Sequence, residues 1–98
     1  MFNKLKQIQD LRKKAKELQG NLAQDTVTGE SLDGQIKITM DGNQKIQDVS
    51  IDENILTPEN KKMIEKGMVD AFEKAIKNVQ SIMAQKLQSG EINLPDLS

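Results

Sequence analysis

The alternation of apolar and polar residues over positions 35–40 predicts a β-strand. Ile36, Ile38 and Met40 point to one side of such a strand, and the polar residues between them point to the other. This period of two is typical of a strand with one buried face and one solvated face. The Asp41-Gly42 pair follows directly, and Asp-Gly between two apolar-patterned runs is a strong hairpin signal. The pattern therefore predicts that the strand turns back on a neighbour.

The return strand is predicted over Lys45–Ile51, where Val49 and Ile51 share one face. Ile46 falls on the opposite parity, which predicts a β-bulge or a side chain that this core does not use. A short first strand is predicted over Thr26–Thr28, because these residues are β-branched. Together the three segments predict a three-stranded antiparallel sheet.

Glycines mark the predicted turns. Gly29 and Gly34 bracket a turn ahead of the hairpin, and Gly42 lies in the hairpin turn itself. Two further glycines fall inside helical patterns. Gly20 weakens the last turn of the first helix, whereas Gly67 costs the second helix about 1 kcal/mol relative to alanine. A close approach of another backbone is one reason for a glycine at position 67.

Helices are predicted on both sides of the sheet. The first spans Phe2–Leu22, and its apolar residues are spaced alternately three and four apart in a seam formed by Ile8, Leu11, Ala15, Leu18 and Leu22. The second begins at Thr57-Pro58, an N-cap followed by proline at the first helical position, and ends at Ser89-Gly90. Its apolar stripe consists of Ile64, Met68, Phe72, Ala75, Ile76, Val79, Met83 and Leu87. Residues 89–98 are predicted to be a mobile tail.

These elements predict an α+β fold, with an N-terminal helix, a three-stranded antiparallel sheet and a long C-terminal helix in one domain spanning residues 1–98. We expect the apolar face of the sheet to lie on the helices. The core is thin, because only two of the 98 residues are aromatic and 30% are charged. A chain of this size buries only about 60–70% of its unfolded surface. A homodimer that buries a shared apolar face is therefore expected.

The net charge of −1 conceals a separation of positive from negative charge along the chain. Residues 1–22 contain six basic and two acidic residues, whereas residues 23–60 contain two basic and eight acidic ones. Residues 61–88 contain six lysines and three acids. The helices are therefore basic and the sheet region is acidic, which keeps a polyanionic partner in consideration despite a pI near 5.4.

Several classes of chemistry are excluded by residue types that the sequence lacks. The chain has no Cys and no His, so disulfides, thiolate nucleophiles, most zinc sites and imidazole catalysis are excluded. A calcium loop beginning at Asp41 fails, because Ile46 stands where glycine is required. We predict no enzyme activity, no metal, no cofactor and no small-molecule substrate. No apolar run approaches the length of a membrane span, and Met1–Lys6 does not resemble a signal peptide, so an intracellular protein is expected.

The segment Val27-Thr28-Gly29-Glu30-Ser31, Gly34 before an alternating strand, Gly42 at the turn and the closing Val49-Ser50-Ile51-Asp52 resemble the YbaB/EbfC family of bacterial nucleoid-associated proteins. The lysine-rich helix before this unit and the Val69-Asp70-Ala71-Phe72 helix after it are similar too. The resemblance implies the same α+β fold and a tight homodimer whose helices project as two arms. It also implies association with the nucleoid in the cytoplasm and an effect on nucleoid organisation and gene expression.

The resemblance and the separated charges together predict binding to double-stranded DNA, mainly through phosphates and with little base readout. Lysine and arginine side chains on a rigid helix neutralise backbone phosphates and displace counterions. The chain lacks aromatic residues arranged to stack on bases, which argues against sequence-specific recognition of single strands. The predicted contacts are Lys4, Lys6, Arg12, Lys13, Lys14 and Lys16, assisted by Lys66, Lys74 and Lys77.

Two other interpretations account for the same residues. The lysines could form solvated faces that only keep the protein soluble, while the apolar seams recruit a partner helix, which would make the chain a protein-interaction module. The first helix could instead lie on a membrane, although its apolar face is narrow and lacks tryptophan. Asp10 and Glu17, which lie within the predicted DNA-binding helix, favour the interpretations that do not involve DNA.

Overall fold

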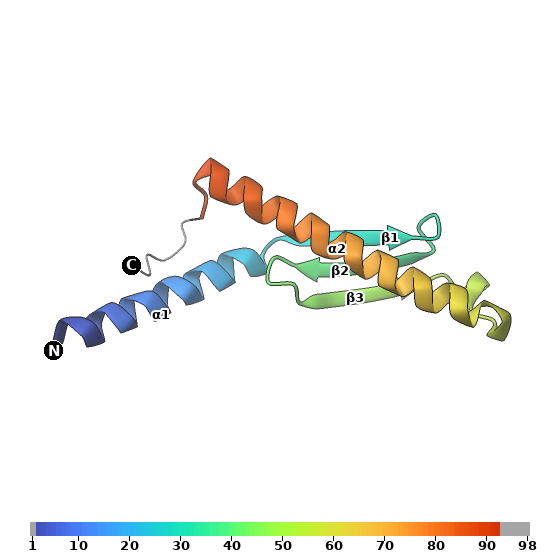
Figure 1. Cartoon of the computed structure of the whole chain (residues 1–98), viewed down its shortest axis with the longest axis horizontal. Coiled ribbons are helices and arrows are strands. Elements are labelled where there is room, and N and C mark those ends of the chain that lie inside the picture. The colour runs from blue at the N-terminus through green and yellow to red at the C-terminus, as the bar shows by residue number, and fades with distance from the viewer. Residues whose placement is uncertain (1, 93–98) are drawn as a thin grey trace.

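The computed structural model describes residues 2–92, with side chains from Lys4 onward. The chain folds into helix α1 (Phe2–Ala23), strands β1 (Thr26–Ser31), β2 (Ile36–Asp41) and β3 (Ile46–Ile51), two single-turn 3-10 helices (Glu53–Ile55 and Pro58–Asn60), and helix α2 (Lys61–Ser89). The predicted α+β class and the predicted order of elements are confirmed (Figure 1).

The three strands form an antiparallel sheet in the order β1-β2-β3. The register between β2 and β3 shifts at Thr39 and Met40, so that β3 holds one extra residue, Gln47. This confirms the predicted bulge. Met40 pairs with Ile46, and directly opposed residues of antiparallel strands point to the same face. In a regular strand Ile46 would point to the face opposite Val49. The bulge places Ile46 on the same apolar face as Val49.

Helix α2 is the helix that covers this apolar face among the described residues. It lies over β1 and β2 (Figure 1), and the core is made of fully buried side chains from β2 and small side chains from α2, namely Ile36, Ile38, Met40, Ala71, Ala75 and Val79. Helix α1 instead extends away from one end of the sheet. The expectation that the sheet packs on both helices is therefore wrong, because α1 reaches the rest of the chain only through its last turns.

Two glycines set the distance between α2 and the sheet. A β-carbon on Gly29 would overlap the carbonyl oxygen of Ala71 and the backbone nitrogen of Ala75, so α2 approaches β1 more closely than any side chain would permit. A β-carbon on Gly67 would meet Ile36 at 2.8 Å. The Ser31 hydroxyl donates a hydrogen bond of 2.6 Å to the carbonyl of Gly67, which links the helix and the strand at this contact.

Gly29 therefore lies inside β1, and its prediction as a turn residue is wrong. The turn falls later, where Leu32, Asp33 and Gly34 all adopt positive φ angles of 52°, 56° and 86°. Thr28-Gly29 continues as strand because Gly29 is the residue on which α2 rests. Gly42 does lie in the hairpin turn, as predicted.

The ends of α2 agree closely with the prediction. Thr57 precedes Pro58, which opens a 3-10 turn that leads into α2, although the Thr57 side chain makes no capping hydrogen bond. Gly90, with a φ of 78°, caps the C-terminal end. Ile92 is only 5% exposed, and its N–H donates to the Lys86 carbonyl at 3.4 Å. The first part of the predicted mobile tail is therefore folded back, and its residues 93–98 lie outside the described residues.

We predict that Gly29→Ala lowers the free energy of unfolding by about 2 kcal/mol or more, because the added methyl group overlaps backbone that cannot rotate away. Gly20→Ala is the matched control, since Gly20 has no atom within 4 Å of the new methyl group. That control is expected to stabilise the protein by about 0.5–1 kcal/mol. Urea unfolding at one fixed protein concentration measures both. A Gly29→Ala variant as stable as the parent protein would contradict this account of the helix–sheet contact.

Candidate functional site

Helix α1 forms an arm whose apolar seam is uncovered over most of its length. Ile8 is 49% exposed and the neighbouring Leu5 is 62% exposed, whereas Leu22, at the base of the arm, is 4% exposed. Leu11 and Leu18 are half-buried. None of the described residues covers the outer part of this seam, which leaves it available to another apolar surface.

The six predicted phosphate contacts on α1 are all exposed, and none of them forms an ion pair with any described carboxylate. At 100° per residue, Lys6 and Lys13 lie opposite the seam, while Arg12 and Lys16 lie along one side of it. Lys14 lies along the other side and Lys4 on the seam itself. The arm therefore presents ammonium and guanidinium groups around much of its circumference. Phosphate oxygens accept hydrogen bonds from such charged N–H donors.

The two acids of the arm are confined to one side of it. Asp10 follows Lys6 by four residues, and Glu17 follows Lys13 by four residues, so each carboxylate is a neighbour of one of these lysines on the helix surface. Arg12 and Lys16 are also four residues apart and lie on the side that carries no acid. The most uniformly positive part of the arm is therefore the side that holds Arg12 and Lys16.

One carboxylate of the sheet region is held within the body of the protein. Asp41 is 4% exposed and accepts hydrogen bonds from the backbone N–H groups of Asn43 and Lys45, at 2.8 Å and 3.1 Å. Its second oxygen accepts from the Gln47 amide at 3.2 Å, so Asp41 fixes the hairpin turn and is not a free cation ligand. Within residues 2–92, no group of three His, Cys, Asp or Glu side chains is placed to hold a metal ion.

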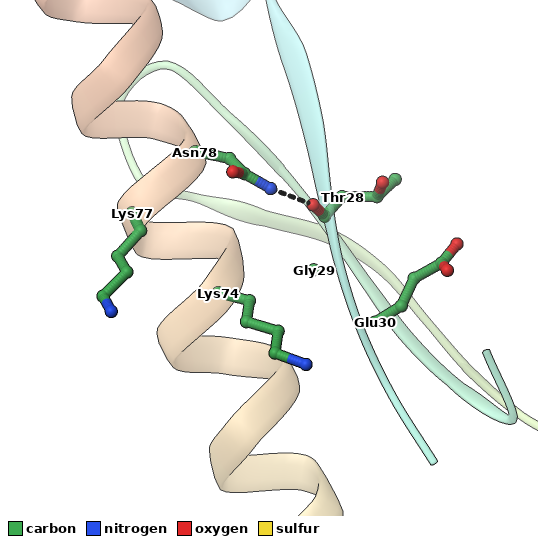
Figure 2. A pocket seen from close by; sticks show the side chains of 6 residues that line it. All are labelled: Thr28, Gly29, Glu30, Lys74, Lys77 and Asn78. Atoms are coloured by element: carbon green, nitrogen blue, oxygen red, sulfur yellow. Dashed lines mark hydrogen bonds between the residues drawn. The ribbon is translucent and has the colours of Figure 1, made fainter. Parts of the chain in front are cut away.

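A second cationic region lies where α2 passes the free edge of β1 (Figure 2). A groove of about 470 Å³ is lined there by three residues of each element: Thr28, Gly29, Glu30, Lys74, Lys77 and Asn78. The Asn78 amide donates a 2.6 Å hydrogen bond to the carbonyl oxygen of Thr28, and the Lys74 side chain extends toward β1.

The charge of this groove is positive because Glu30 is paired elsewhere. The Glu30 carboxylate is 3.2 Å from the ammonium of Lys37 on β2 and points away from α2. The structure therefore brings Lys74 and Lys77 together, whereas Lys66 is exposed on α2 outside the groove. Asn78 was not predicted as a site residue. Its contact with Thr28 joins residues 50 apart in the chain, and no local pattern marks it.

An exposed apolar surface, here called the α2–β3 flank, occupies the opposite side of α2. It is formed by Ile46 and Val49 of β3, which are 45% and 42% exposed, and by Val69 and Phe72 of α2, which are 56% and 40% exposed. Phe72 and Lys74 lie on opposite sides of the stripe that α2 buries, and Lys74 faces the β1 edge, so Phe72 faces β3. Val49 and Phe72 were both predicted to be core residues, and they are exposed because α2 is centred on β1 and β2.

None of the helices in the described part of the chain combines the length and the apolar character that crossing a membrane requires.

Comparisons with known proteins agree on one family. Residues 1–91 match the profile of the YbaB/EbfC DNA-binding family. A nucleoid-associated protein of Beijerinckia indica is 36% identical over 97 residues, which cover 97% of this chain and 96% of that protein. A nucleoid-associated protein of Bartonella bacilliformis is 28% identical over 95 residues, covering 97% of this chain and 88% of that protein.

The fold has a counterpart among solved structures. The crystal structure of an uncharacterised protein from Helicobacter pylori superimposes with a TM-score of 0.63 over 80% of this chain and 90% of that chain. At 19% sequence identity this likeness shows a shared fold.

Proposed function

Because the chain belongs to the YbaB/EbfC DNA-binding family, we propose that it is a nucleoid-associated protein that binds double-stranded DNA as a homodimer. Binding is mainly through phosphates, with little base readout, and it affects nucleoid organisation and gene expression in the cytoplasm. The observation that carries this proposal is the α1 arm, on which six exposed cations have no ion-pair partner among the described residues. The whole chain acts as one DNA-binding domain.

Phosphate contact is the recognition mode that suits these side chains. Lysine and arginine neutralise phosphates without reading sequence, and each neutralised phosphate releases condensed counterions. The proposed contacts on the arm are Lys4, Lys6, Arg12, Lys13, Lys14 and Lys16. Lys74 and Lys77 at the β1-edge groove, together with Lys66, form a second and weaker set, because Asp70 and Glu73 are interspersed among them on α2.

A second copy of the chain is the proposed occupant of the α2–β3 flank. The flank is continuous with the hydrophobic core, because Ile46 and Val49 lie on the sheet face whose other half α2 already covers. It carries four large apolar side chains that are 40–56% exposed, on a chain with only two aromatic residues for its interior. A two-fold arrangement buries the same surface on both protomers and gives one body with two cationic arms.

The dimer assignment predicts that Phe72→Asp shifts the protein toward monomers, because an unpaired carboxylate at the centre of an apolar interface is strongly unfavourable. Met63→Asp is the matched control: Met63 is also 40% exposed on α2 but lies away from the flank. Analytical ultracentrifugation across a concentration series measures the dissociation constant. We expect a rise of at least about 100-fold for Phe72→Asp, the scale of a hot-spot residue, and none for Met63→Asp. Equal behaviour of the two variants would contradict the assignment.

The phosphate mechanism predicts a steep dependence of DNA affinity on salt. If four to six phosphates are neutralised per dimer, log affinity falls with log salt at a slope of about −4 to −5. The triple charge reversal of Lys6, Lys13 and Lys16 to glutamate is expected to abolish retention of random and specific duplexes alike in electrophoretic shifts at moderate salt.

The control for this reversal changes the net charge by the same amount at exposed lysines outside the proposed contacts, namely Lys45, Lys61 and Lys62. That control should retain most of the DNA affinity. A binding isotherm that stays flat from low to moderate salt would contradict the phosphate mechanism. Equal losses in both triple variants would show that net charge alone drives binding, without a cationic arm.

A protein-interaction module is the second candidate function, and the uncovered outer part of the α1 seam favours it, since Ile8 is 49% exposed. Under this alternative the seam recruits a partner helix and the lysines only keep the arm solvated. The reversal of Lys6, Lys13 and Lys16 separates the two functions, because it leaves the seam intact while removing the phosphate contacts.

A further inference from the structure

The α1 arm is joined to the rest of the chain by contacts confined to its last turns. The carbonyl of Leu22 accepts a hydrogen bond from the N–H of Gly42 at 2.8 Å. The carbonyl of Gln19 accepts one from the Asn43 side chain at 3.0 Å. Both donors belong to the β2–β3 turn. The residues of the arm from Lys4 to Glu17 are exposed except for the half-buried Leu11, so the contacts that the described residues make with the arm all lie at its base.

A third contact at this base comes from the far end of α2. The ammonium group of Lys86 donates a 2.7 Å hydrogen bond to the side-chain oxygen of Asn21, in the last turn of α1. The same ammonium forms an ion pair with Asp25, in the segment between α1 and β1. The Lys86 side chain is only 13% exposed and that of Asp25 is 30% exposed, so both charges are partly withdrawn from solvent.

We propose that Lys86, Asp25 and Asn21, here called the clasp, fix the direction of the α1 arm relative to α2 and thereby position its cations for DNA. The proposal rests on the DNA-binding function proposed above. The clasp residues are positioning residues and do not contact DNA themselves. A rigid arm presents its cations at a fixed spacing, whereas a loose arm must lose conformational freedom each time it binds.

Lys86 is poorly suited to be a phosphate contact of its own. Its side chain is 13% exposed, and its ammonium is already shared between the carboxylate of Asp25 and the amide oxygen of Asn21. An additional contact would have to break this pairing and leave a partly buried carboxylate without a counter-charge, which is unfavourable. The surface lysines of the arm carry no such cost.

The direction in which one substitution changes the DNA affinity distinguishes a positioning role from a purely electrostatic one. Asp25→Ala removes a negative charge near a polyanion-binding arm, so electrostatics alone predicts tighter DNA binding. The clasp predicts weaker binding, by about fivefold or more, the lower end of typical coupling between sites. Glu59→Ala is the matched control: it removes one exposed acid from the 3-10 turn before α2, whereas Lys86 lies in the last turn of that helix. It is expected to leave DNA affinity within about twofold, since long-range charge effects are screened by salt.

A distance measurement without DNA tests the arm itself. Because the chain contains no cysteine, spin labels can be placed on Gln9→Cys in α1 and Gln85→Cys in α2, with labelled protomers diluted in excess unlabelled protein. The clasp predicts a narrow distance distribution for the parent protein and a broad one for Asp25→Ala. Lys86→Met, which keeps the aliphatic stem, should broaden it in the same way, and Lys86→Arg should restore the narrow distribution together with the DNA affinity.

The DNA affinities and the distance distributions together support or overturn the proposal. Broadening together with weaker DNA binding supports it. DNA affinity that is unchanged or increased in Asp25→Ala overturns it, as does weaker binding without broadening. Thermal unfolding curves identify a variant that fails to fold, in which case the Lys86→Met and Lys86→Arg pair provides the test. If the parent protein binds no DNA, the proposed function fails, whereas the distance distributions still decide whether the clasp holds the arm.

Discussion

The contact of α2 with β1 determines how the rest of the molecule is arranged. Gly29 offers no side chain, and Ala71 and Ala75 offer only small ones, so helix and strand backbones meet directly. Small residues at a helix–sheet contact permit dense packing, so a single added methyl group there overlaps neighbouring atoms. Because the close approach is possible only over β1, α2 is centred on that side of the sheet and leaves β3 largely uncovered. The exposed α2–β3 flank is a consequence of this off-centre placement.

The distribution of charge follows the same division between the body of the protein and the α1 arm. Some acidic side chains of the sheet region are held by local partners, as in the hydrogen bonds that Asp41 accepts and the Glu30–Lys37 pair. The basic residues of α1 have no such partners among the described residues. A protein with a net charge of −1 thus presents a positive surface along the outer part of the arm. Interactions between exposed charges are local, because salt screens them beyond about 10 Å.

The parts of the fold that depend on neighbouring residues could be predicted from the sequence. The alternation around Ile38, the Asp41-Gly42 turn, the bulge at β3 and the glycine cap of α2 are all local signals, and all four were found. Features that depend on contacts distant in sequence could not be predicted. The position of α2 over β1 rather than β3 depends on the fit between Gly29 and two alanines more than 40 residues away, which periodicity does not encode.

The residues of the candidate site likewise include some that could be predicted from the sequence and some that could not. The basic face of α1 could be read from helical spacing, and the structure places all six of its cations at the surface. The grouping of Lys74 and Lys77 with Asn78 beside β1 could not, because it requires knowing which side of α2 meets the strand edge. The hydrogen bond between Lys86 and Asn21 joins residues 65 positions apart, and no sequence motif predicts it.

The β2–β3 turn has a consequence for how such proteins could diversify. Its Gly42 and Asn43 hold the last turns of α1, whereas the charged side chains lie further along that helix. The residues that hold the base of the arm and the residues that give it its positive charge therefore lie in separate segments of the chain. Substitutions in a few loop residues could therefore change the direction of the arm during evolution without altering a single basic side chain.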